Sequence, residues 1–421
     1  MTTTHTTMTV AGTGVPVAPD VVRMQADRNA RLRAGMAAQG VDVLVLLATG
    51  NVTYATGATW PLADAGRANV ERPVAVVVAG DDQAHLFTPF RDAGASPAER
   101  GIGLDDDHVH GPVYLDFDEG VEAFAAVLAG LLPANAVVAV DDVTAAMHRN
   151  HSLLFVEWPP RAAGDVMGPA RLVKTPDELV VMRHGLWIAE QAMADVQLHL
   201  EPGMHQTDLT ARFLHRAFEL GADANILDPI WQVMPDRRGD LPWTVNDDIA
   251  CPLLTTEREL AAGDVLWVDT SMLYGGFHTD FGRTWIVGGE PSARQQAQYE
   301  QWRAINDAAL AVLRAGATGA DLTAAARAVT ATSELGGPTP WMAHFYLAHG
   351  MGLDSAEMPF IGSDLGDAYD ASLVLEAGTI VVLEPVVWDE GHSGYRSENV
   401  YVVTDDGYRD LTDYPYDPYG D

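Results

Sequence analysis

Residues 263–288 read GDVLWVDTSMLYGGFHTDFGRTWIVG, and this stretch decides the fold. Two runs rich in β-branched and aromatic residues flank a Tyr-Gly-Gly sequence, a pattern that predicts a β-hairpin. Each run carries one aspartate, Asp269 in the first and Asp280 in the second. A turn centred between Tyr274 and Gly275 would place the two aspartates opposite each other, with Cβ atoms about 4.5–5.5 Å apart. The hairpin is therefore expected to bring two carboxylates together around metal ions.

A second pair of strands around a turn is expected in residues 378–404, GTIVVLEPVVWDEGHSGYRSENVYVVT. Glu384 and Glu398 lie at equal distances from Gly391 along the chain, which predicts that they also face each other. Both interrupt apolar strand-like runs, where burying a charge is costly unless the charge is paired or binds a metal. The alternative is two solvated carboxylates at the edge of a sheet.

Between the two pairs lies HFYLAHGMGLDSAEMPFIG, in which His349 precedes a Gly-x-Gly sequence. One histidine among 14 carries little information alone, but the neighbouring carboxylate pairs make His349 a candidate fifth ligand. Four converging carboxylates carry four negative charges, which two divalent cations would neutralise. One imidazole among oxygen donors favours Mn, Fe, Co or Zn over Ca.

This ordered set resembles the pita-bread metallopeptidases, which include methionine aminopeptidase, prolidase and aminopeptidase P. The resemblance rests on the eleven-residue separation of the aspartates and on the sequences DFGRT, HGMG, LEP and RSE. It implies that two divalent metal ions are bound by five side chains: Asp269, Asp280, His349, Glu384 and Glu398.

The resemblance also implies a role for each ligand. Asp280 and Glu398 bridge the two ions, Asp269 binds one ion, His349 binds the other, and Glu384 also carries a proton. Two ions roughly 3.5–4 Å apart would lower the pKa of a shared water and provide hydroxide. Arg396, two residues before Glu398, matches the family as well.

The expected architecture is α/β (α+β) with two domains. The resemblance implies a creatinase-like α/β domain over residues 19–168 and a pita-bread catalytic domain over residues 169–421, preceded by disordered residues 1–18. Periodicity and capping signals support this organisation. They predict a helix over residues 21–39 followed by a strand, a hairpin over residues 72–90, a strand near residue 137, and a long helix capped by Thr175. Further helices are expected around residues 208–220, around residues 295–314 and after residue 320.

The sequence departs from the peptidase pattern at two positions. Family peptidases have a histidine seven residues after the HG ligand, where this chain has Ala356, and another upstream of the first aspartate, where it has Ala250 or Cys251. Losing one donor of this kind costs about 10²–10³ in rate. The candidates to replace them are His278, Tyr346, Asp354, Ser355 and Arg396. His278 is expected on the same strand face as Asp280 because the two are two residues apart.

A tryptophan-rich segment precedes the metal hairpin. Trp231 and Trp243 are candidates for the wall of a substrate pocket, and the alternative is that both are core residues. Arg237 and Arg238 are candidates to bind a substrate carboxylate, or are solvated loop charges.

Three functions are compatible with these residues. The first is a metal-dependent hydrolase of a small peptide or amide, resembling an Xaa-Pro dipeptidase. The second is a non-peptide enzyme such as a dimethylsulfoniopropionate-type lyase, although that lyase carries an aspartate where this chain has Ser271. The third is a catalytically silent binding module, against which the complete ligand set argues.

Composition limits the partners and the compartment. The 421 residues carry a net charge of −34, so phosphate backbones and anionic membrane surfaces are not expected partners. Lys174 is the single lysine, in a context unlike that of a Schiff-base or phosphate-binding lysine. Cys251 is the single cysteine, which excludes an intrachain disulfide and favours the cytoplasm. The resemblance to prolidases implies a homodimer.

Overall fold

The computed structural model describes residues 17–59, 72–89, 104–133, 135–226, 230–234, 257–335, 337, 339–341 and 345–420. The predictions for Arg237, Arg238, Trp243, Ala250 and Cys251, and those for the first 16 residues, lie outside this range. The chain divides into two compact units, Pro19–Glu178 and Leu179–Asp421, so the division falls ten residues after position 168. No described helix is long and apolar enough to span a bilayer.

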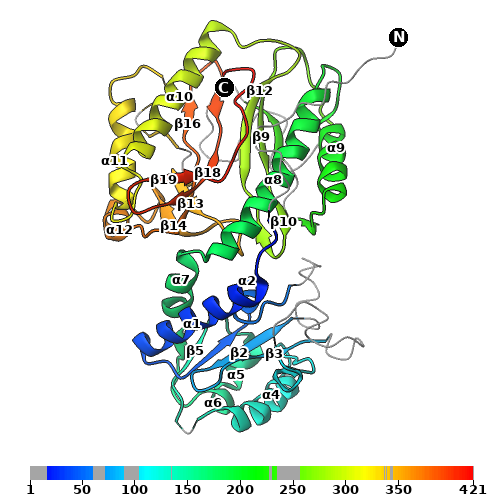
Figure 1. Ribbon diagram of the computed structural model, residues 1–421, viewed down its shortest axis with the longest axis vertical. Coiled ribbons are helices and arrows are strands. Elements are labelled where there is room, and N and C mark those ends of the chain that lie inside the picture. Colours follow the sequence, from blue (N-terminus) through cyan, green and yellow to red (C-terminus); the bar gives the residue numbers. More distant parts are fainter. Residues whose placement is uncertain are drawn as a thin grey trace. The chain divides into compact units, whose positions relative to one another are not determined.

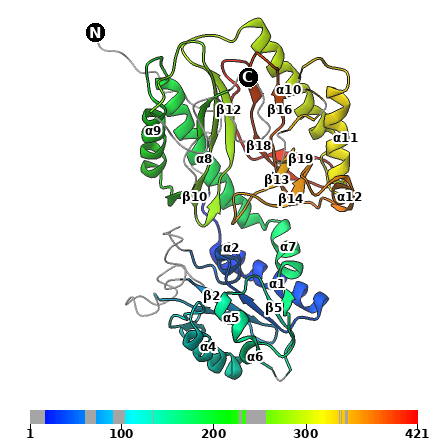
Figure 2. The same cartoon turned by 180° about the vertical axis from the view of Figure 1, so that it is seen from behind.

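The N-terminal unit is built on one mixed six-stranded sheet, ordered β4-β3-β2-β1-β5-β6. Its strands are β1 (Val43–Leu46), β2 (Val74–Val78), β3 (Ala84–Phe87), β4 (Val109–His110), β5 (Val138–Val140) and β6 (Arg161–Ala162). Its helices are α1 (Val21–Gln39), α2 (Thr49–Thr56), the 3₁₀ helix η2 (Asp106–His108), α4 (Asp118–Leu131), α5 (Ala145–Arg149), α6 (His151–Leu154) and α7 (Gly164–Leu172). Figures 1 and 2 show α4, α5 and α6 on the opposite side of the sheet from α1, α2 and α7.

The helix end and the hairpin that the sequence predicts for this unit are both present. Helix α1 ends at Gly40, whose φ of 60° suits a glycine in the left-handed region. β2 and β3 form the predicted antiparallel hairpin. Alternate apolar residues of β1 and β2, such as Val43 and Val76, share one apolar core with Phe124 of α4. The predicted helix and strand opening of this unit is therefore confirmed.

The C-terminal unit contains two main sheets, ordered β12-β9-β8 and β14-β13-β15-β18-β19, and the smaller sheets β11-β10-β7 and β16-β17. The strands are β7 (Ala224–Asn225), β8 (Ile230–Val233), β9 (Val265–Thr270), β10 (Met272–Tyr274), β11 (Phe277–His278), β12 (Phe281–Ile286), β13 (Ala348–Gly350), β14 (Glu357–Ile361), β15 (Ile380–Leu383), β16 (Val386–Trp388), β17 (Gly394–Arg396), β18 (Asn399–Val403) and β19 (Tyr408–Asp410). The two main sheets meet at a bridge between Gly282 and Glu398.

Helices flank these sheets on two sides, as Figure 1 shows. They are α8 (Pro176–His199), α9 (Gln206–Glu219), α10 (Ala293–Val312), α11 (Gly319–Thr330) and α12 (Asp367–Ser372). Thr175 caps α8 as predicted, because its hydroxyl accepts from the Glu178 amide at 3.2 Å and Glu178 accepts from the Thr175 amide at 2.7 Å. Trp302 of α10 and Leu322 of α11 join the main apolar core of this unit. The three further helices lie within a few residues of their predicted positions.

The first hairpin has a different register from the predicted one. β9 and β12 pair Asp269 with Gly282, not with Asp280. The turn centres on Gly275 and Gly276, whose φ angles of 59° and 81° lie in the region that favours glycine, so Tyr274 stays in the strand. The two-residue shift keeps Asp269 and Asp280 on the same face and makes them diagonal neighbours.

The second predicted register is confirmed. β15 and β18 pair Leu383 with Asn399, and β16 and β17 pair Val386 with Arg396. Both pairings place Glu384 opposite Glu398, because the residue numbers of every pair sum to 782.

The C-terminal tail is tied to the hairpin through Arg283. The buried guanidinium donates to the carbonyl oxygens of Gly282, Glu398, Tyr414 and Pro415 at 2.6–3.0 Å. It also lies 4.5 Å from the Tyr416 ring centroid. The Tyr-rich tail is therefore an integral part of this unit.

Candidate metal centre

The five predicted ligands come from strands, or from strand ends, that the two main sheets bring together. Asp269 lies on β9, Asp280 just before β12 and His349 on β13, while Glu384 follows β15 and Glu398 precedes β18. The side chains of His349, Glu384 and Glu398 are 1–3% exposed, whereas those of Asp269 and Asp280 are 13% and 15% exposed. The two aspartates therefore form the more open edge of the cluster.

The side chains form two groups that share Asp280. In the first, one oxygen from each of Asp269, Asp280 and Glu398 lies within 4.8 Å of the others. In the second, His349 Nε2 lies 3.1 Å from Asp280 Oδ2 and 3.5 Å from Glu384 Oε1. Asp280 is therefore the one carboxylate that belongs to both of these groups.

Arg396 supplies the main internal counter-charge. Its guanidinium donates to Asp269 Oδ2 at 3.1 Å, to Glu384 Oε2 at 2.5 Å and to Glu398 Oε2 at 3.0 Å. The side chain is 3% exposed, and its Cζ lies 4.8 Å from the Trp267 ring centroid. Arg396 therefore fixes the positions of three carboxylates at once.

The donors present fit divalent cations. Glu384 Oε1 and Glu398 Oε1 are buried and make no hydrogen bond to any described residue. His349 Nδ1 lies 2.8 Å from the Gly350 carbonyl oxygen, which selects the tautomer with a proton on Nδ1 and leaves Nε2 to act as a ligand. A cluster with buried carboxylate oxygens that accept no hydrogen bond and with an oriented imidazole is suited to bind metal.

Burial and mutual repulsion shift the titration of these groups. Burial raises the pKa of Glu384 to about 7 and raises the pKa of Glu398 well above its ordinary value. Burial and the neighbouring Asp280 carboxylate also raise the pKa of Asp269. Burial opposes the charged form of His349, but its contact with Asp280 outweighs that effect and raises its pKa to about 9. Without cations, the cluster is therefore electrostatically strained.

Gly282 has a role in this site that the sequence reasoning missed. A Cβ atom on Gly282 would lie 2.5 Å from Glu398 Oε1 and 2.7 Å from the Val268 carbonyl oxygen. Only glycine lets the Glu398 carboxylate lie across β12 at this position. The glycine in DFGRT was the available signal.

The proposed substrate residues lie in different surroundings. The Tyr346 ring lies 4.8 Å from the His349 ring, and burial together with the Glu384 and Asp280 carboxylates raises the pKa of its hydroxyl. Asp354 is exposed, and Ser355 and Ala356 are half-buried, in the loop before β14. The structure thus brings Tyr346 to the cluster.

His278 and Trp231 both make hydrogen bonds within the C-terminal unit. β11 ends at His278 and β12 begins at Phe281, so Asp280 lies in the short connection between the two strands. The His278 amide donates to the Gly352 carbonyl oxygen at 2.8 Å. Trp231 is 1% exposed, and its indole NH donates to Thr210 at 2.9 Å. Trp231 therefore packs in the core against Phe213 of α9.

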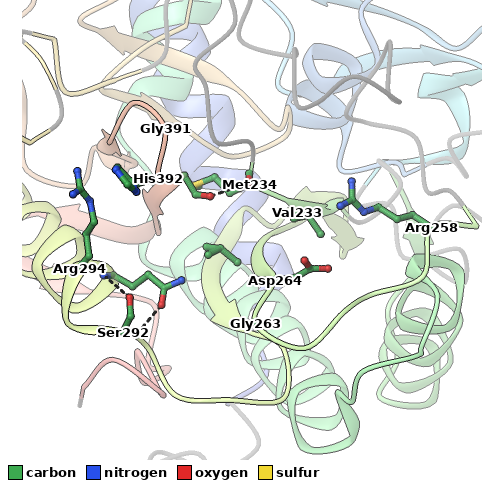
Figure 3. A pocket seen from close by; sticks show the side chains of 12 residues that line it. Val233, Met234, Arg258, Gly263, Asp264, Ser292, Arg294, Gly391 and His392 are labelled. Atoms are coloured by element: carbon green, nitrogen blue, oxygen red, sulfur yellow. Dashed lines mark hydrogen bonds between the residues drawn. The ribbon is translucent and has the colours of Figure 1, made fainter.

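A cavity of about 470 Å³ lies elsewhere in this unit and includes none of the five ligands. Figure 3 shows Arg258, Asp264 and Arg294 around it. Its polar groups serve the fold: Ser292 and Gln295 cap α10, and Arg294 forms a two-bond ion pair with Asp389 at 2.6 Å. The chemistry therefore points to the carboxylate cluster.

Comparison with known proteins agrees with this geometry. Residues 181–405, more than half of the chain, match the description "Metallopeptidase family M24". The chain belongs to metallopeptidase family M24. Residues 28–155 match the creatinase/prolidase N-terminal domain. The protein is accordingly a metal-dependent hydrolase with a pita-bread catalytic domain and a creatinase-type N-terminal domain.

Several M24 relatives are similar over most of the chain. A probable dipeptidase PepE of Mycobacterium tuberculosis is 28% identical over 305 residues, which cover 72% of this chain and 75% of that protein. An Xaa-Pro dipeptidase of Pyrococcus furiosus is 26% identical over 248 residues, covering 59% and 65% of the two chains. The prolidase structure from Pyrococcus horikoshii OT3 superposes with a TM-score of 0.72 at 20% identity, covering 93% and 99% of the two chains, which shows the shared fold.

Proposed function

We propose that this chain is a dinuclear-metal-dependent hydrolase of a small peptide or amide, resembling an Xaa-Pro dipeptidase. The observation that carries the proposal is the pair of ligand groups that share Asp280. Asp269 would bind one ion, His349 and Glu384 would bind the other, and Asp280 and Glu398 would bind both, as the resemblance implies. The oxygen-rich donor set with one imidazole suits Mn, Fe, Co or Zn.

Two such ions would supply Lewis acidity and a water of lowered pKa. Around them, we expect Glu384, which contacts both His349 and Arg396, to accept a proton and return it to the leaving group, as the resemblance to the family implies. Arg396 holds the carboxylates in place. Tyr346, whose ring lies 4.8 Å from the His349 ring, is the candidate donor to a developing oxyanion.

We further propose that hydrolysis of ordinary Xaa-Pro dipeptides is weak. The motivation is Ala356 in the place of a family histidine, since a metal-activated water does not by itself orient a scissile amide. The test measures kcat/KM on a panel of dipeptides and small amides for the native protein and for Ala356→His, with metal content verified. The matched control is Ala356→Leu, which adds bulk without a donor.

We expect Ala356→His to raise kcat/KM on proline dipeptides at least tenfold, towards the ~10²–10³ attributed to one such donor. Vigorous native turnover with no gain from the histidine would refute this expectation and indicate that another residue, such as His278 or Tyr346, already serves. Cleavage of a sulfonium substrate without any peptide turnover would favour the lyase alternative.

We also propose that the protein works in the cytoplasm as a homodimer. The single cysteine supports the compartment, and the net charge of −34 argues against nucleic acids and membranes as partners. Light scattering should give twice the chain mass of 45.2 kDa. A mass equal to one chain at working concentration would exclude the dimer.

A further inference from the structure

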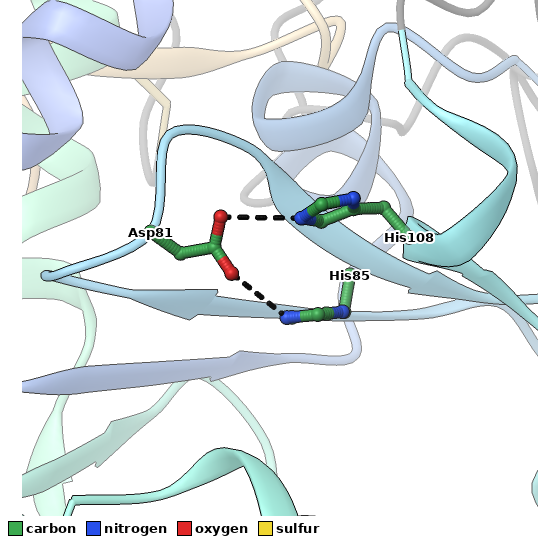
Figure 4. A group of neighbouring side chains, drawn as sticks. All are labelled: Asp81, His85 and His108. Carbon is green, nitrogen blue, oxygen red and sulfur yellow. Dashed lines mark hydrogen bonds and ion pairs between the residues drawn. The ribbon is translucent and has the colours of Figure 1, made fainter.

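The N-terminal unit holds a cluster of imidazoles and carboxylates that the hydrolase site does not use (Figure 4). Asp81 lies in the turn between β2 and β3, His85 on β3, and His108 at the end of η2. One donor atom from each lies within 4.8 Å of the other two. We infer that Asp81, His85 and His108 form a separate binding site for a divalent transition-metal ion of the zinc type.

Both imidazoles point the same ring nitrogen at one carboxylate. His85 Nε2 lies 3.2 Å from Asp81 Oδ2, and His108 Nε2 lies 3.1 Å from Asp81 Oδ1. Zinc bonds of about 2.0–2.1 Å in a tetrahedron separate the ligand atoms by roughly 3.3 Å. Because the two imidazoles contact different oxygens of Asp81, only one of the three separations among the ligand atoms already matches. The others lie within 4.8 Å, and closing them requires the two stacked imidazoles, with centroids 4.7 Å apart, to tilt together.

The far nitrogens of the same rings are also held. His108 Nδ1 lies 3.0 Å from Asp107 Oδ1, and His85 Nδ1 lies 3.0 Å from His110 Nε2. The His110 ring in turn stacks on Phe87 with centroids 4.6 Å apart. A metal-binding histidine generally donates a hydrogen bond from its other ring nitrogen to a neighbouring acceptor, which fixes the orientation of the ring and its tautomer. This outer arrangement is a second observation, independent of the three ligand atoms, that points to a metal.

Charge and access also suit a cation. The carboxylates of Asp81, Asp105 and Asp107 lie close to His108, so the local potential is negative. The side chains of Asp81, His108 and His85 are 32%, 16% and 8% exposed, which leaves room for a water as fourth ligand. Two imidazoles and one carboxylate are a donor set that zinc accepts without a thiolate. The bound ion would tie the β2–β3 turn to η2 and stabilise this part of the unit.

The test counts zinc bound per full-length chain by elemental analysis after equilibration with micromolar free zinc. Wild type, Asp81→Asn and His108→Asn are compared, each with and without Asp280→Asn, so that the two sites are separated. We expect both N-terminal variants to bind one zinc fewer per chain in either background. The matched control is the double variant His148→Asn/His151→Asn, which removes another imidazole pair of the same unit, with ring centroids 6.4 Å apart, and should lose none.

A second readout needs no variant. Zinc should slow amide hydrogen exchange in wild-type peptides that cover residues 81–87 and 105–110. Unchanged zinc content in both N-terminal variants, or an equal loss in the control, would overturn the inference. So would unchanged exchange in both peptides at saturating zinc.

Discussion

Gly282→Ala is the sharpest test of how the hydrolase site is assembled. The added Cβ would lie 2.5 Å from Glu398 Oε1 and 2.7 Å from the backbone oxygen of Val268. Ordinary contacts of this kind are about 3.4 Å or longer, so the carboxylate has to move by nearly an ångström. The Val268 oxygen belongs to paired strand β9 and yields less easily.

The expected cost follows from these two contacts. Overpacking of this size destabilises a protein by about 1–3 kcal/mol, which corresponds to a Tm lower by roughly 2–12 °C for a unit of this length. A displacement of about 1 Å in a catalytic group costs about 10²-fold in rate. We therefore expect reduced metal content and kcat/KM lower by about two orders of magnitude on whichever panel substrate the native enzyme cleaves.

Gly289→Ala is the matched control, because its Cβ would meet only Ile286 at an ordinary 3.8 Å in the same unit. Elemental analysis, thermal melting and kcat/KM are measured for both variants. Native metal content and native turnover in Gly282→Ala would refute the placement of Glu398 in the site. Equal losses in the two variants would attribute the effect to glycine replacement in general.

Three further predictions follow from the same geometry. Asp280→Asn should lose metal and nearly all turnover because one carboxylate serves both ligand groups, and unchanged metal stoichiometry would remove Asp280 from the site. Chelation should lower the Tm. The Tm of the metal-free protein should also fall as pH rises from about 4.5 to 9, because folding raises the pKa of Glu384 to about 7 and that of His349 to about 9. Protonation of these two groups stabilises the folded state, and this stabilisation is lost as each group releases its proton. A metal-free Tm that rises over this pH range would contradict the sign. Arg283→Met should destabilise the protein by about 3–5 kcal/mol because the carbonyl oxygens of Glu398, Tyr414 and Pro415 lose this donor. A denaturation midpoint equal to that of Arg409→Met, an exposed arginine of the same unit, would contradict this.

The two carboxylate pairs show how well strand pairing can be predicted from the position of a turn in the sequence. The Glu384–Glu398 prediction succeeded because the apolar strands on both sides of the Gly391 connection contain no bulge. The pairing register is therefore the same in both strand pairs. The Asp269–Asp280 prediction failed by two residues because turn chemistry fixes the centre of the hairpin. Gly275 and Gly276 both accept positive φ, and a tyrosine at either position would be strained.

The convergence of the aspartates survived that error because side chains alternate with a period of two. A shift by one residue would have turned Asp280 to the opposite face of the sheet. The face of each ligand was therefore more predictable from the sequence than its exact partner.

Long-range packing accounts for what the sequence did not reveal. Gly282 lies within a recognised motif, but its close approach to Glu398 depends on how two separate sheets meet. Arg283 binds carbonyl oxygens more than a hundred residues away, and no spacing rule predicts such partners. His108 lies 23 residues after His85, a separation that matches no local metal motif, and only the pairing of β3 with β4 brings that part of the chain beside His85.

Arg396 explains how a protein can fold around four carboxylates and still bind cations. Its guanidinium reaches Asp269, Glu384 and Glu398, while His349 reaches Asp280, so each carboxylate has one positive partner from the chain itself. The guanidinium binds Oε2 of both glutamates, and Oε1 of each keeps no hydrogen-bond donor among the described residues. The protein therefore neutralises the cluster only in part, and the net negative charge that remains favours the binding of cations. A lysine, with a single point charge and no planar fork, would not hold three carboxylates in this arrangement.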